Sequence, residues 1–179
     1  MIIPVKVFAV DAPYGETTMT REQRLTNAVQ SQQLVVDDVS KAMLAQKCAA
    51  AQKILTGVQE RSSKQIILIT NTYSGIQKEM LAIELRMSRQ GADASEIELL
   101  IGKLQQKLDQ FTISANTYGT SLDDTITVDC AQRPELFKAG LVMLRAHQGE
   151  LQATVQNLYI TLQNAQRETF EQLKNRLRV

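Results

Sequence analysis

The sequence predicts an all-α protein, an elongated antiparallel bundle or coiled coil of three to four long helices. Two stretches repeat apolar residues at alternating steps of three and four, the spacing of one face of a coiled-coil helix. Prolines number only three in 179 residues, and aromatic side chains make up 4%. Such a composition is typical of long helices. We expect a single helical-bundle domain over 20–179, preceded by an extended segment over 1–19.

Charge and composition exclude several classes of protein. Lys and Arg number 20 against 19 Asp and Glu, so the net charge is only +1. That balance provides no general attraction to nucleic acid or to an anionic membrane. Hydrophobic residues make up 44% of the chain, which argues against intrinsic disorder.

The first 19 residues have the least helical pattern. Ile3, Val5 and Val7 alternate with other residues as in a short strand, and Pro13 and Gly15 then interrupt the segment. The segment lacks the basic start and cleavage motif of a signal peptide, and no apolar run approaches the roughly 18 residues of a membrane span. Localisation stays open between a cytoplasmic chain and a secreted chain that has already been processed.

The next region predicts helices over about 20–60 and 63–90. Thr20 and Gln23 fit a capping box at the start. An apolar face then runs along the first helix, although Gln32 interrupts it; its members are Leu25, Val29, Val36, Val39, Met43, Ala50, Ile54 and Val58. Gly57 and the polar stretch 60–64 favour a break between the helices. Because no proline intervenes, one continuous helix from about 20 to 90 is the alternative.

The most regular pattern is a heptad stripe, here called the core seam, that starts at Ile66. It continues through six residues that we predict to bind a partner: Ile69, Tyr73, Ile76, Met80, Ile83 and Met87. A narrow stripe of this kind buries less than the broad face of a globular bundle helix. We therefore expect other subunits to complete the core, with this stripe as the contact. Packing within the chain is the ordinary alternative.

Two more helices are predicted, over about 96–118 and 134–178. Gly91 is suited to end the preceding helix, and Ser95 with Glu98 forms a capping box for the first of the two. Gly119 is its expected stop, and Pro134 is suited to the first turn of the last helix. Between them, 124–130 alternates Ile126, Val128 and Cys130 with polar residues, which predicts a short strand. Its natural mate is 3–10, giving a small two-stranded β patch.

Cys48 and Cys130 are the two cysteines. Two free thiols that pack as small hydrophobic side chains are the ordinary interpretation. A disulfide between them is the alternative, and it would imply an oxidising compartment.

No motif predicts catalysis, a cofactor or a metal, so we assign no catalytic, cofactor-binding or metal-binding residue. The chain has a single histidine, His147, through which any nucleophilic dyad would run. One histidine cannot supply the paired motifs of a di-iron bundle, and no phosphate-binding loop is present. An enzyme would require a polar pocket around His147, Glu150 or Tyr159.

These observations favour a non-enzymatic structural or assembly protein that acts through helix–helix packing. We expect a homo-oligomer or a subunit of a multiprotein assembly; secretion apparatus, pilus and virion components are analogies only. Nucleic acid is not an expected partner, and a membrane is not indicated. The alternative is a secreted, membrane-active or effector helical protein that inserts its apolar faces.

Overall fold

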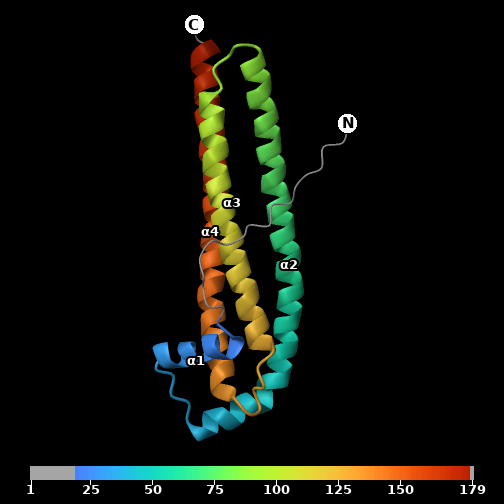
Figure 1. The fold of residues 1–179 in the computed structure, drawn as a ribbon, viewed down its shortest axis with the longest axis vertical. Helices are drawn as coiled ribbons and strands as arrows, with labels where there is room; N and C mark the ends of the chain where they lie inside the picture. The colour runs from blue at the N-terminus through green and yellow to red at the C-terminus, as the bar shows by residue number, and fades with distance from the viewer. Residues whose placement is uncertain (1–18, 178–179) are drawn as a thin grey trace.

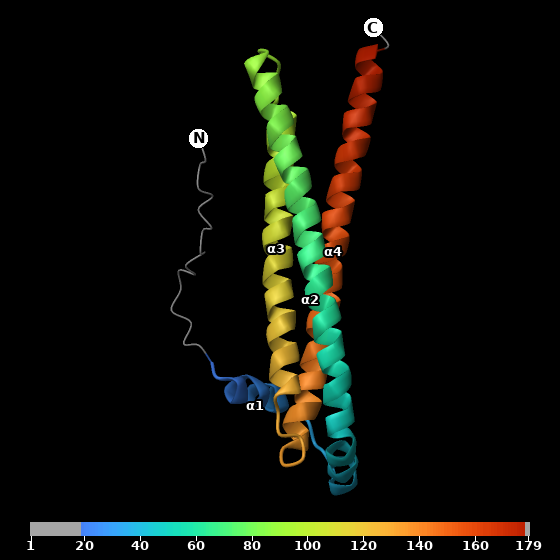
Figure 2. The same ribbon diagram turned by 90° about the vertical axis from the view of Figure 1, so that its right-hand side faces the viewer.

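The computed structural model describes the backbone of residues 19–177, and the side chains up to residue 165 together with residue 167. Its elements are α1 (Arg21–Ser31), α2 (Asp38–Arg89), α3 (Ser95–Ile126) and α4 (Pro134–Leu177). The three long helices run along one another as an antiparallel rod, and α1 lies across one end (Figures 1 and 2). We call that end the foot: α1, the start of α2, the 127–133 turn and the start of α4. The all-α bundle is confirmed.

The predicted β patch is wrong in its described half. The described residues contain no strand: α3 continues as helix through Ile126, and 127–133 forms a turn. Val128 and Cys130 are buried in the foot, which explains their apolar character without a strand. The other predicted strand, 3–10, lies outside the described residues.

The first two helices divide at a different place from the predicted one. α1 ends at Ser31, and α2 is continuous from Asp38 to Arg89. Gln33 adopts a positive φ of 48° in the connection, and the side chain of Asp37 caps α2 by accepting a bond from the Ser40 amide. The expected break at 60–64 is absent: the helix continues through this stretch, and the Ser62 hydroxyl donates to the Gln59 carbonyl within it.

Other helix ends are partly as predicted. Thr20 and Gln23 form the capping box, Gly91 follows α2 with φ 71°, and Pro134 begins α4. Two of the predicted helix ends are wrong. Ala94 occupies the N-cap of α3, where the Ser95 amide donates to Asp93 Oδ1 at 3.0 Å. α3 also runs almost two turns beyond Gly119, to Ile126, and in this extension Leu122 packs against Leu144 of α4.

The core is divided along the rod. A foot cluster joins Leu25, Cys48 and Phe137, while a shaft cluster joins residues of α3 and α4, including Phe111 and Leu158. The helices α3 and α4 share the most extensive packing, and α2 packs mainly on α3. Consequently α2 has only one fully buried residue, Cys48, in its 52 residues.

Candidate interaction surfaces on α2 and the foot

The predicted partner-binding stripe lies mostly inside the bundle. Ile69, Tyr73, Ile76 and Met80 are half-buried and pack against the shaft cluster of α3 and α4. Towards the end of α2, Ile83 is 45% exposed and Met87 is half-buried. The structure therefore uses the first four residues for packing within the chain and leaves Ile83 as the most accessible member.

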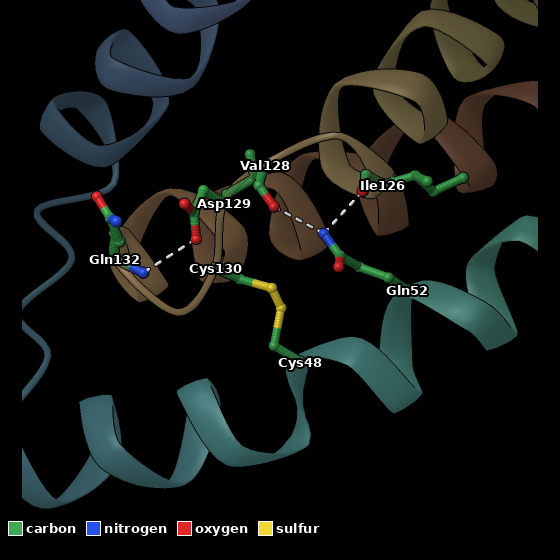
Figure 3. Close-up of a disulfide and its surroundings, with 7 residues drawn as sticks. All are labelled: Cys48, Gln52, Ile126, Val128, Asp129, Cys130 and Gln132. Carbon is green, nitrogen blue, oxygen red and sulfur yellow. Dashed lines mark hydrogen bonds between the residues drawn. A yellow bond between two sulfur atoms is a disulfide. The ribbon is translucent and has the colours of Figure 1, made fainter.

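A disulfide joins α2 to the 127–133 turn. Cys48 and Cys130 have Cα atoms 5.9 Å apart and are both buried, so the two-free-thiol interpretation does not describe this structure. One turn further along α2, the Gln52 amide donates to the carbonyl oxygens of Ile126 and Val128, each at 2.7 Å (Figure 3). The first bond satisfies a carbonyl at the end of α3, where the last carbonyls lack a partner within the helix, and the second satisfies a carbonyl of the 127–133 turn.

Two ion pairs hold α1 to the end of α3 and to the 127–133 turn. Arg24 contacts Asp124 through both carboxylate oxygens at 2.7 Å, and the Asp124 side chain is only 4% exposed. The hydrogen bond from Arg24 to Asp124 raises the pKa of Arg24. Arg133 in the turn reaches Glu22 at 2.6 Å, but both side chains are largely exposed. The first pair is the one whose loss would leave a buried charge.

A groove of about 590 Å³ lies where α2, α3 and α4 face one another. Phe111 and Tyr118 come from α3, and apolar and amide side chains come from α2 and α4. No residue of the lining is charged, so the groove has no feature suited to an ionic ligand. Its remaining members are Ser62, Gln65, Ile66, Leu68, Ile69, Gln148, Leu151, Gln152, Val155 and Gln156.

The outer surface of α2 carries large apolar side chains in solvent. Two members of the predicted first apolar face are buried: Leu25 of α1, and Val36 in the connection between α1 and α2. Two other members, Val39 and Ile54 of α2, are 72% and 66% exposed. Core residues of α2 near the foot are instead Cys48, Ala51 and Leu55. Eight large apolar residues of α2 are exposed: Val39, Met43, Ile54, Ile67, Leu68, Leu81, Ile83 and Leu85.

Sequence reasoning missed Ile67 and Leu68 as surface residues. The signal was present, because 66–69 is a run of four apolar residues. Consecutive helical residues point about 100° apart, so at least one of four such residues faces away from any single core.

The residues that an enzyme would need do not converge on the groove. His147 Nδ1 and the Ser121 hydroxyl lie 2.5 Å apart, but Ser121 is buried at the α3–α4 contact and neither residue lines the groove. Glu150 is exposed, and Tyr159 bonds to Gln163 on its own helix. Burial, and then the neighbouring Tyr159, raise the pKa of Tyr73. Among the described residues no group of three His, Cys, Asp or Glu could hold a metal ion.

No helix within the described part of the chain combines the length and hydropathy that a membrane span requires. Comparison with protein-family models, curated proteins and solved structures finds no match to this chain.

Proposed function

We propose that this chain is a non-enzymatic structural protein, a subunit of a larger assembly that forms by packing of helices. One observation carries the proposal: α2 buries a single residue completely while it exposes eight large apolar ones. Burying one such side chain contributes about 1.5–3 kcal/mol. Eight on one helix therefore provide a strong driving force for association.

The arrangement of these residues supports a helical partner. They are spread along a helix that is roughly 78 Å long at 1.5 Å per residue, rather than gathered in one concave pocket. A partner that covers them would have to be elongated as well. A helix that lies along the rod meets that requirement, and small-molecule binding does not.

The disulfide supports a place for this assembly in an oxidising compartment. A buried disulfide between two long-separated cysteines persists where thiols are not kept reduced. Within the classes of assembly named by analogy, this favours a component that works outside the cytosol, as in a secretion apparatus or a pilus.

The direct test is the solution mass of the oxidised protein, measured by light scattering after size exclusion across a tenfold range of concentration. The proposal predicts a discrete oligomer or growth with concentration. A concentration-independent 20 kDa monomer that also causes leakage of anionic liposomes would contradict it and favour the membrane-active alternative. Leakage is a suitable discriminator because assembly through helix packing does not require insertion into a bilayer.

A further inference from the structure

A second regular stripe runs along α2, beside the core seam. Its ten members follow one another at alternating steps of four and three without exception; they are Lys47, Ala51, Ile54, Val58, Arg61, Gln65, Leu68, Thr72, Gly75 and Glu79. We call this stripe the side seam. Residues at such steps share one face of a helix. Unlike the core seam, this face is mixed: Ile54, Val58 and Leu68 are large and apolar, and the other seven members are small, polar or charged.

Most of the side seam is open to solvent, whereas Ile83 is the one exposed member of the core seam. Eight of its members are exposed, and only Ala51 and Val58 are half-buried. Gln65 and Leu68 line the groove, so the side seam faces the open side of the bundle between α2 and α4. Lys47 and Glu79 form no ion pair within the described part of the chain.

Part of the side seam is complementary to its own reverse. Ser63 stands at the centre, and three of the five pairs of seam residues equally far before and after it have matching chemistry. Lys47 corresponds to Glu79, and Val58 corresponds to Leu68. The small residue Ala51 corresponds to the small residue Gly75. The other two pairs, Ile54 with Thr72 and Arg61 with Gln65, join unlike side chains.

We infer that the side seam is covered by α2 of a second copy of this chain, running antiparallel, with a two-fold axis near Ser63. In that alignment each Lys47 lies beside Glu79 of the other copy, and each Val58 lies beside the other Leu68. A parallel alignment is disfavoured because it would place Lys47, Arg61 and Glu79 against identical charges, and like charges in register destabilise helix pairs. This inference rests on the assembly function proposed above, and it specifies the partner that covers two of the eight exposed apolar residues of α2, Ile54 and Leu68.

The groove supports the same position. It is lined by Ser62, Gln65 and Leu68, which surround the inferred axis. A second α2 seated there would close the groove over Phe111 and Tyr118. Amides from Gln148 and Gln152 on α4 both donate and accept hydrogen bonds, so they can pair with the polar residues at the centre of the second seam.

The size of the contact sets the expected strength. The contact comprises the ten seam residues and the α4 side of the groove. That is fewer residues than the roughly 20–30 per partner of a standard stable interface. We therefore expect a dimer that dissociates on dilution into the micromolar range. Lys47 and Glu79 are placed at the two ends of the seam, where they set the direction of pairing.

Charge exchange within one chain tests the inference. The oxidised full chain is compared with the variants Lys47→Glu, Glu79→Lys and the double exchange, by sedimentation equilibrium at low salt. In a dimer, each single exchange places like charges side by side at both ends of the seam. It should therefore raise the dimer Kd about tenfold. The double exchange restores opposite charges at both ends and should return the Kd to within about threefold of the original.

Two off-seam exchanges, Lys53→Glu and Glu60→Lys, are matched controls on the same helix and should leave the Kd unchanged. Circular dichroism of each variant checks that the helices persist. A dimer for which the double exchange fails to restore affinity, or for which the controls weaken it equally, would overturn the side-seam contact while leaving the assembly function standing. A monomer at every concentration would overturn the inference together with self-assembly.

Discussion

Single residues matter most near the foot, where α1, α3 and α4 contact one another. Asp124 is a buried carboxylate whose charge is matched by Arg24 of α1, a residue a hundred positions away in the sequence. Gly140 of α4 allows α3 to approach closely at the same level: a Cβ there would lie 2.6 Å from the Thr125 hydroxyl. Both features belong to one contact between α1, α3 and α4.

Replacement of Arg24 by Ala should lower the free energy of unfolding by about 2 kcal/mol, because it leaves the Asp124 carboxylate buried without its cation. The loss is smaller than for a fully buried pair because Arg24 is itself 31% exposed. Urea unfolding followed by circular dichroism measures the change. Arg133→Ala, which breaks an exposed pair, is the control and should cost less than about 1 kcal/mol. Equal losses in the two variants would contradict this account of Asp124.

Replacement of Gly140 by Ala should destabilise the protein by about 1–3 kcal/mol through overpacking against Thr125, although Ala is the better helix former. Gly149 on the same helix has nothing within 4 Å of the corresponding position. Gly149→Ala should therefore stabilise by up to about 1 kcal/mol. Thermal unfolding of the two variants should give shifts of opposite sign; a rise in Tm for both would show that α3 and α4 are farther apart than described.

At the scale of the element, the core seam shows why the sequence predicts α2 and its C-terminal end but not its start. The alternating steps from Ile66 to Met87 predict a helix there, and the structure has one. The break after Ser31 was missed because Gln33 adopts its positive φ without the Gly or Asn that usually marks such a turn. Conversely, the polar stretch 60–64 looks like a turn, yet the helix continues through it because nothing there disrupts backbone bonding.

The end of α3 was misjudged for a related reason. Alternating apolar residues after Ile126 suggested a strand, but they are buried by the foot cluster and by the disulfide, which are contacts distant in sequence. The groove likewise could not be foreseen, since it depends on how far α4 stands from α2. Spacing along the chain predicts which residues share a helix face; it does not say which neighbour covers that face.

The start of α2 should respond to acid. Hydrogen bonds from the backbone and side chain of Ser40 lower the pKa of Asp37 below its usual 3.8. Because the pKa of Asp37 is lower in the folded state, its cap stabilises the helix fully at pH values above the pKa of the unfolded state. That stabilisation is lost as the pH falls through the pKa of the folded state. We expect amides of the first turn of α2 to lose protection from hydrogen exchange below about pH 4.

An Asp37→Asn variant provides the control for this titration. Its amide oxygen can still accept the Ser40 bond, but the side chain does not titrate. The first turn of that variant should keep the same protection across the acid range. Identical acid responses in the variant and the original would assign the effect to another group.

The disulfide should stabilise the foot much more than the shaft. Closing a loop with a sequence separation of 82 residues contributes about 4 kcal/mol in the chain-entropy model. The double variant Cys48→Ser, Cys130→Ser should lose about that much stability, and hydrogen exchange should accelerate first in α1 and in 127–133. A reducing agent should have the same effect on the original chain and none on the variant. Uniform acceleration along the whole rod would contradict separate stabilisation of the foot.

At the scale of the whole molecule, helix packing covers one side of the rod and leaves another side exposed to solvent. α3 and α4 supply the buried shaft, whereas α2 covers one face of that shaft and presents its remaining faces to solvent. Figures 1 and 2 show the three long helices extending from the same foot. A stable foot and an open α2 together suit a subunit that keeps its own fold and adds neighbours along its length.

Hydrogen exchange along α2, measured by mass spectrometry at protein concentrations above and below association, tests the central claim most directly. Association through α2 predicts that exchange over 47–79 slows as concentration rises, while exchange in the buried stretch 104–115 of α3 does not change. An α2 whose exchange is the same at every concentration would contradict the claim that this helix is the surface of assembly.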